Sequence, residues 1–139
     1  MTATLNAIER KSLEKGLKLT GQRSLIARVL LAVADHPDAE EVFRRGRVVD
    51  PSLSLSTVYR SLKLWEDHGI VARHDFGDGR ARYEPARDDH HDHLIDTTSG
   101  QVIEFADDEL EALQEVIARK LGYRLVGHRL TLYGAPEPG

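Results

Sequence analysis

The sequence contains no cysteine, and this absence excludes two kinds of site. Without thiols there is no disulfide framework and no thiolate-ligated zinc, so a bound metal needs His, Asp, Glu or Gln ligands. Long apolar runs are absent as well, since even VLLAVA at 29–34 is too short to span a membrane or to form a signal-peptide core. We therefore expect a cytoplasmic protein with no membrane partner.

Charge is distributed unevenly along the chain. The net charge of the 139 residues is −4, but residues 1–86 hold 14 Lys and Arg against 12 Asp and Glu, whereas residues 87–139 hold 5 against 11. The first part can approach phosphates and the second would be repelled by them. Together with the proline and charge run EPARDD at 84–89, this pattern predicts domains over 1–84 and 93–139, joined by a hinge at 85–92.

The first part predicts three helices followed by a hairpin. Helical spacing of apolar residues appears in RSLIARVLLAVAD at 23–35, and a shorter helix is expected over DAEEVFRRG at 38–46. A third helix lies within LSLSTVYRSLKLWEDHGIV at 53–71, and IVARHDFGDGRARYE at 70–84 predicts a hairpin with a Gly-Asp-Gly turn. This order is typical of a winged helix-turn-helix domain. The expected buried positions of the first helix are Leu25, Ile26, Val29, Leu30 and Val33.

The third helix has a polar face that suits DNA. Its apolar side carries Leu55, Val58, Leu62 and Trp65. On the opposite side lie two hydroxyl-bearing side chains and two cations but no acid, as a helix in a major groove requires; they are Ser56, Tyr59, Arg60 and Lys63. An ordinary solvated face is the alternative, and the hairpin that follows favours DNA.

The stretch RDDHHDHLIDTTSG at 87–100 places three histidines and four aspartates in its first ten positions. If residues 90–95 are extended, His91 and His93 share one face while His90 and Asp92 share the other. One run can therefore contribute to two distinct metal sites.

The rest of the chain predicts a small sheet with one helix. LIDTTSGQVIEF at 94–105 is expected to turn at Ser99 and Gly100, and YRLVGHRLTLYG at 123–134 to close as a strand carrying His128. Between them, DDELEALQEVIARKLG at 107–122 predicts a helix with an acidic first turn and a basic last turn. Its expected buried stripe is Leu110, Leu113, Ile117 and Leu121. So small a unit is hardly stable alone, which favours pairing with a second copy.

Six motifs together resemble the ferric uptake regulator family of bacterial metal-responsive repressors. They are GLKLTGQR at 16–23, STVYRSL at 56–62, GIVARHDF at 69–76, HHDHLID at 90–96, GQVIEF at 100–105 and GYRLVGHRLTLYG at 122–134. The resemblance implies an α+β protein with an N-terminal winged helix-turn-helix domain and a small C-terminal α/β dimerisation domain. It also implies a homodimeric, metal-dependent repressor of metal-homeostasis genes that binds palindromic double-stranded DNA operators.

The resemblance assigns two metal sites and a set of DNA contacts. The family's regulatory site maps to His36, Glu84, His91, His93 and Glu104, and its second site to His90, Asp92, Glu111 and His128. The implied DNA contacts are Lys18, which would reach a minor groove, together with Ser56, Thr57, Tyr59, Arg60 and Lys63.

The sequence departs from the family at its structural zinc. Asp96 and Ser99 replace the first of two Cys-x-x-Cys pairs, so no Cys-ligated structural zinc is expected. Glu84 and Glu104, in place of the aspartates of peroxide-sensing relatives, favour metal sensing. Five nitrogen and oxygen ligands suit Fe²⁺ or Mn²⁺ as corepressor, with Fe²⁺ preferred here, and Zn²⁺ would also bind such a site.

Other functions are consistent with the same residues. A manganese-responsive regulator is the alternative within the family, and metal sites of purely structural role are another. A metalloenzyme with Glu104 as general base is disfavoured, because five protein ligands leave little room for a water molecule, so we expect no catalytic activity.

Single residues also have simpler interpretations. His36 could be an ordinary loop histidine, Lys18 a solvated lysine, and Glu111 with Glu115 a solvated helix face. We expect His68 to bond carbonyls at a helix end and His74 to meet solvent or phosphate.

Overall fold

The computed structural model describes residues 4–33, 35–87 and 90–138. The chain divides into two compact units, Met1–Arg87 and Asp88–Gly139. Positions 88 and 89 of the expected hinge lie outside the described residues. None of the helices in the described ranges combines the length and apolar character needed to cross a membrane.

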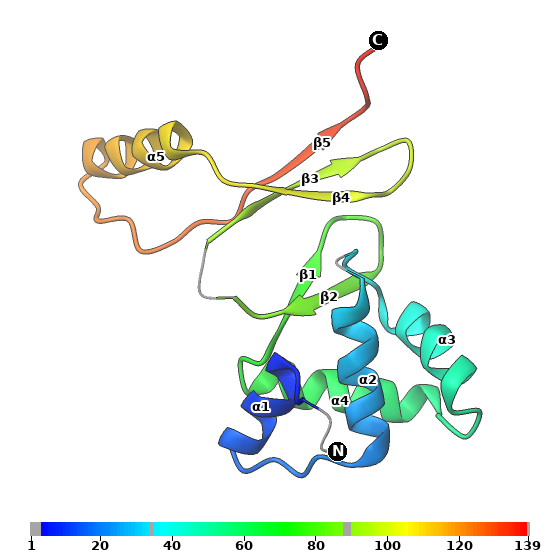
Figure 1. Ribbon diagram of the computed structural model, residues 1–139. Helices are drawn as coiled ribbons and strands as arrows, with labels where there is room; N and C mark the ends of the chain where they lie inside the picture. The colour runs from blue at the N-terminus through cyan, green and yellow to red at the C-terminus, as the bar shows by residue number, and fades with distance from the viewer. Residues whose placement is uncertain (1–3, 34, 88–89, 139) are drawn as a thin grey trace. The chain divides into compact units, whose positions relative to one another are not determined.

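In the N-terminal unit, the described residues form four helices and a two-stranded hairpin (Figure 1). The helices are α1 (Ala7–Glu14), α2 (Gly21–Ala32), α3 (Ala39–Val49) and α4 (Leu55–Asp67). Strands β1 (Val71–Asp75) and β2 (Ala81–Pro85) follow and pair antiparallel. The predicted winged helix-turn-helix arrangement is confirmed, with α1 as an additional helix that the hydrophobic pattern did not predict.

Local capping explains where these helices begin. Asn6 and Glu9 form a capping box on α1, in which each side chain accepts a hydrogen bond from the other residue's backbone N–H. Ser54 caps α4 by accepting from the Thr57 N–H at 3.1 Å, a contact typically worth about 1 kcal/mol. The cap fixes the first turn of α4, which carries several of the expected DNA contacts.

The apolar faces of the helices meet in one core. Val58, Leu62 and Trp65 of α4 are fully buried there, as the sequence pattern predicts. Val33 is an exception, since its exposed fraction is 52%. It is the C-cap of α2 and has extended backbone, so the helical spacing ends one residue before it.

The C-terminal unit, as far as residues 90–138 show it, is a three-stranded sheet with one helix. Its elements are β3 (Asp92–Asp96), β4 (Val102–Phe105), α5 (Asp108–Lys120) and β5 (Thr131–Gly134). The strand order is β4-β3-β5, with β3 antiparallel to β4 and parallel to β5. The β3–β4 turn contains Gly100 with φ 78°, which confirms the expected hairpin.

Two predictions for this unit are wrong. The last strand is only Thr131–Gly134, so His128 precedes it. In the sheet β5 lies on the side of β3 away from β4, and the connection between β4 and β5 consists of α5 and a return segment, residues 121–130, which holds His128.

The prediction that α5 has a buried apolar stripe is also wrong for the single chain. No residue of α5 is buried, and Leu113, Ile117 and Leu121 are 56%, 47% and 71% exposed. Among its described residues, 90–138, the unit has one helix and one sheet, and these residues offer no second layer to cover this side of α5. The amphipathic spacing therefore describes an apolar surface that is open within one chain.

Candidate metal centre

In the N-terminal unit, His36 and Glu84 are held side by side. His36 lies in the loop between α2 and α3, and Glu84 lies on β2. The His36 Nε2 atom is 2.7 Å from Oε2 of Glu84. His36 has φ 54°, a left-handed conformation that only a few residue types, His among them, adopt with any frequency.

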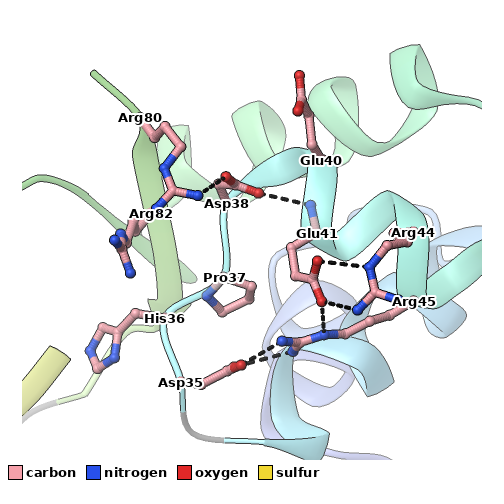
Figure 2. Close-up of a pocket in the computed structure, with 10 residues that line it drawn as sticks. All are labelled: Asp35, His36, Pro37, Asp38, Glu40, Glu41, Arg44, Arg45, Arg80 and Arg82. Atoms are coloured by element: carbon pink, nitrogen blue, oxygen red, sulfur yellow. Dashed lines mark hydrogen bonds and ion pairs between the residues drawn. The ribbon is translucent and has the colours of Figure 1, made fainter. Parts of the chain in front are cut away.

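An ion-pair network on α3 fixes the loop beside His36. Figure 2 shows Arg45 reaching from α3 to both Asp35 and Glu41, while Arg44 also contacts Glu41. The hydrogen bond from Arg44 is the main cause that lowers the pKa of Glu41 from 4.5 to about 2, and Arg45 adds to it. The loop that presents His36 is therefore joined to a rigid helix through Asp35.

The same network borders a pocket whose charges balance. It is lined by four carboxylates, four guanidinium groups, His36 and Pro37. Across it, Arg80 donates to Asp38 at 3.0 Å. Acidic and basic side chains are equal in number here, so the pocket has no net charge that would select an ion of one sign.

In the C-terminal unit, His91, His93 and Glu104 form a second group of candidate ligands. His93 and Glu104 are directly opposite each other in the β3–β4 pairing, and side chains so placed share one face of the sheet. The His91 and His93 ring centroids are 4.9 Å apart, and His91 Nε2 is 3.7 Å from Oε1 of Glu104. Two imidazoles and a carboxylate are thus gathered within this unit.

A third group, also within the C-terminal unit, gathers His90, Asp92, Glu111 and His128. Their ligand atoms all lie within 4.8 Å of one another. The His128 Nε2 atom is 3.0 Å from Oδ1 of Asp92 and 3.0 Å from Nε2 of His90. Glu111 Oε1 lies 3.4 Å and 3.6 Å from the His90 and His128 Nε2 atoms.

This third group has the chemistry that a divalent ion requires. Asp92 is 1% exposed, and its Oδ2 atom has no hydrogen-bond partner among the described residues. Burying such an oxygen without a partner costs free energy, which a cation beside it would offset. Two imidazole nitrogens and two carboxylates therefore suit a borderline divalent cation.

Three elements position this group. Asp92 begins β3, Glu111 is in the first turn of α5, and His128 lies in the return segment before β5. The expected separation of the HHDH run into two faces agrees with the structure, because His90 lies with Asp92, whereas His91 lies with His93.

The residues expected to contact DNA are mostly exposed. Tyr59, Arg60, Ser56 and Lys63 lie on the outer face of α4, and Lys18 is exposed before α2. Thr57 is only half-buried and accepts a hydrogen bond from Arg60 Nη2 at 3.3 Å.

Lys63 and Arg60, the two cations of this face, differ in their surroundings. Lys63 Nζ is 3.0 Å from Oδ1 of Asp67, and this contact raises the lysine pKa. Arg60 lines a shallow pocket with Arg23 and with Thr20 and Gly21 at the start of α2. Arg60 is therefore better placed than Lys63 to engage an outside acceptor.

The sequence also predicted the surroundings of two further histidines, His68 and His74. His68 Nδ1 lies 2.9 Å from the Leu64 carbonyl oxygen, which confirms its expected place at the end of α4. His74 was expected to meet solvent or phosphate; its side chain is 25% exposed, and its Nε2 also lies 2.8 Å from Oε1 of Glu84, a contact that the sequence did not predict. The register of the hairpin puts positions 74 and 84 on one face, which alternation along each strand does not by itself determine.

The chain is similar to proteins of known function over nearly its whole length. The ferric uptake regulator family model matches residues 14–133. A ferric uptake regulation protein of Rhizobium leguminosarum is 57% identical over 136 residues, which cover 98% of this chain and 96% of that protein.

Solved structures are similar as well. A zinc-bound manganese uptake regulator superimposes with a TM-score of 0.83 at 57% identity, covering 94% of this chain and 99% of that one. The Helicobacter pylori ferric uptake regulator, described as having three functional metal binding sites, has a TM-score of 0.84 at 29% identity, covering 98% and 95%.

Proposed function

This chain belongs to the ferric uptake regulator family, a family of metal-responsive transcriptional repressors, and we propose that it binds operator DNA as a homodimer when a divalent ion is bound. The observation that carries the proposal is the convergence of imidazole and carboxylate side chains in both units of a chain whose helix α4 also has an exposed polar face. Operator DNA lies in the cytoplasm of bacteria, which is where we propose that the protein acts.

The regulatory site of this proposal takes ligands from both units. His36 and Glu84 would contribute from the N-terminal unit, and His91, His93 and Glu104 from the C-terminal unit. The pairing of His36 with Glu84 at 2.7 Å and the facing positions of His93 and Glu104 support ligand sets that are partly assembled before an ion arrives. An ion held by both sets would restrict the relative orientation of the two units.

The second site of the proposal is His90, Asp92, Glu111 and His128. All four belong to the C-terminal unit, so an ion there would brace that unit and would not join the two. We assign it an auxiliary, stabilising role.

DNA recognition is assigned to α4. Exposed Tyr59 and Arg60 can reach base edges or phosphates, with Ser56, Thr57 and Lys63 beside them and Lys18 directed to a minor groove. The ion acts as corepressor by selecting the orientation in which two recognition helices match two half-sites. Coupling of this kind is typically about 1–3 kcal/mol, or roughly 5- to 150-fold in DNA affinity.

Fe²⁺ is the proposed ion, and Mn²⁺ is the second candidate. Nitrogen and oxygen ligands without thiolate suit both ions, and Zn²⁺ can substitute because it lies higher in the affinity order. The 57% identity to a manganese uptake regulator supports Mn²⁺ as the second candidate, and the equal identity to a ferric uptake regulation protein supports Fe²⁺. The relatives are named as regulators, and we assign this chain no catalytic activity.

The homodimer is supported by the open apolar side of α5. Leu113, Ile117 and Leu121 present this surface in a unit too small to provide its own second layer. A second copy would cover it with an identical surface, as a two-fold interface requires.

DNA binding across a metal titration tests the proposal. Fluorescence anisotropy of a palindromic operator duplex is measured with anaerobic Fe²⁺, with Mn²⁺ and with Zn²⁺, and with chelator as the control. We expect operator affinity to rise with occupancy of the metal site and to fall when chelator is added. Equal affinity with and without metal would contradict the corepressor role. The ion that acts at the lowest free concentration would decide between iron and manganese.

A further inference from the structure

The carboxylate of Glu84 has an imidazole at each of its oxygens. Oε2 lies 2.7 Å from Nε2 of His36, and Oε1 lies 2.8 Å from Nε2 of His74. An ionised carboxylate only accepts hydrogen bonds, so the His74 ring must donate its Nε2–H to Oε1. Each oxygen of Glu84 therefore has its own imidazole partner.

The hairpin register explains how His74 reaches Glu84. In the β1–β2 pairing, Ala72 lies opposite Glu84 and His74 lies opposite Arg82. Side chains of paired residues share a face, so His74 and Glu84 are diagonal neighbours on one face of the hairpin. Diagonal neighbours are within reach of a ring as long as imidazole.

A second contact fixes the ring from the other side. The rings of His74 and Phe76 are stacked, with centroids 5.3 Å apart and planes 11° from parallel. Phe76 is 3% exposed, so it is itself held by packing. The imidazole of His74 is thus restrained by a buried ring and by a carboxylate.

We propose that His74 is a positioning residue for Glu84 and that it connects metal binding to the β1–β2 hairpin, which is the wing of the winged-helix domain. This inference rests on the proposed function, in which Glu84 is a metal ligand. By holding Oε1, His74 fixes the rotation of the carboxylate and leaves Oε2 directed to the ion with His36. Partners that hydrogen-bond a metal-ligating group in this way typically change metal affinity by about 10- to 100-fold when removed.

The connection to the wing follows from the position of His74 in β1. The turn of the hairpin, residues 76–80, begins two residues after His74. An ion that restrains Glu84 also restrains His74 and the strand that leads into the turn. Because linkage is reciprocal, DNA binding that restrains the wing would also strengthen the contact between His74 and Glu84.

Two substitutions separate hydrogen bonding from ring packing. His74→Phe keeps a ring to stack on Phe76 but removes the donor, whereas His74→Gln keeps an amide donor and removes the ring. Arg73→Ala is the matched control, since Arg73 is exposed on the opposite face of β1. All are made in a His128→Ala background, so that the second site does not obscure the titration.

Mn²⁺ affinity is measured by calorimetry, and thermal unfolding of the metal-free protein is followed by circular dichroism. We expect His74→Phe to weaken Mn²⁺ binding by roughly 10- to 100-fold, with His74→Gln much closer to the parent and Arg73→Ala unchanged. If His74→Phe lowers the metal-free unfolding temperature, His74→Leu replaces it as the variant without a donor.

Two results would overturn the inference. If the variant without a donor binds Mn²⁺ as tightly as the parent protein, His74 has no positioning role. If only His74→Gln binds Mn²⁺ more weakly, the effect comes from ring packing and not from the hydrogen bond. Glu84→Gln and His93→Ala, measured alongside, separate this failure from that of the proposed function. If neither weakens Mn²⁺ binding, the proposed ligand set is wrong; if both do while His74→Phe does not, only the role of His74 is wrong.

Discussion

The Nε2 atoms of His90 and His128 lie 3.0 Å apart, although 38 positions separate the two residues in the sequence. Two imidazole nitrogens at this distance need a proton on one of them, and Asp92 Oδ1 lies within 3.2 Å of both nitrogens. The same nitrogens and the same carboxylate oxygen are the atoms that could bind an ion.

Removal of His128 should therefore affect metal content more than DNA binding. We expect His128→Ala to lower the bound metal per chain and the unfolding temperature of the metal-loaded protein, because all four ligands belong to the C-terminal unit. Metal analysis after dialysis and circular dichroism measure the two effects, with Glu115→Ala on the exposed side of α5 as the control. Loss of operator binding as complete as that in His93→Ala would contradict the auxiliary role.

His93 tests the regulatory site. His93→Ala should abolish the metal-dependent part of operator binding, because it removes an imidazole from the ligand set that would join the two units. The dimer should persist, since His93 is not part of the apolar side of α5. Anisotropy with Mn²⁺ and light scattering after size exclusion measure both, and the exposed Thr97→Ala is the control. Monomeric protein, or unchanged metal dependence, would refute the assignment.

Arg60 and Tyr59 test the recognition helix. If Arg60 reads a base, Arg60→Ala should cost about 1–3 kcal/mol and relax the preference at one operator position. If it contacts phosphate, affinity should fall for all sequences alike, and the salt slope should decrease by roughly one. Arg28→Ala is the control, because it removes one positive charge from α2 instead of α4. Unchanged affinity in Tyr59→Ala and Arg60→Ala, with metal bound and the fold intact, would exclude α4 as the reading helix.

The open side of α5 should be required for the dimer. Ile117→Glu places a charge on this apolar surface, and burying an unpaired carboxylate in an interface is costly. We expect monomers at concentrations where the parent protein is dimeric, as measured by sedimentation velocity. Val48→Glu is the matched control, because Val48 is an exposed apolar residue on the N-terminal unit. A dimer that survives Ile117→Glu would place the interface elsewhere.

The Glu41 network predicts a pH dependence of stability. Its pKa is lowered from 4.5 to about 2, chiefly by Arg44. The stabilisation is therefore fully present above the unfolded-state value and is lost as pH falls through the folded-state value.

Glu41→Gln should destabilise near neutral pH by roughly 0.2–1 kcal/mol, as is usual for ion pairs near the surface, and by progressively less at acidic pH. Urea unfolding near neutral pH and at about pH 3 compares it with the parent protein. Glu40→Gln is the control, since Glu40 is an exposed carboxylate in the same first turn of α3. A destabilisation that does not change with pH would contradict the role of the carboxylate charge.

Periodicity predicted those elements whose burial partners lie in the same unit. The α4 pattern of Val58, Leu62 and Trp65 matched the core because the other helices of the N-terminal unit cover it. The same reasoning failed for Leu113 and Ile117, since amphipathic spacing does not tell whether the covering surface belongs to the same chain. Helix α1 was missed because its signal is the cap formed by Asn6 and Glu9, not a long apolar stripe.

The site was predictable where strand alternation decides it. Alternation separated His90 and Asp92 from His91 and His93, as the contacts of each pair bear out. It did not reveal that His74 contacts Glu84, which depends on the register of the hairpin. The assignment of Glu111 and His128 to one cluster came from family resemblance, because no spacing rule connects the first turn of α5 to the return segment.

The left-handed backbone of His36 limits how this position can change. At φ 54° most side chains are strained by about 1–3 kcal/mol, whereas Gly, Asn, Asp and His occur there more readily. Three of these four offer a nitrogen or oxygen ligand. The substitutions that the loop tolerates best therefore tend to exchange one ligand for another, so that mutation at this position alters ion preference more readily than it abolishes binding.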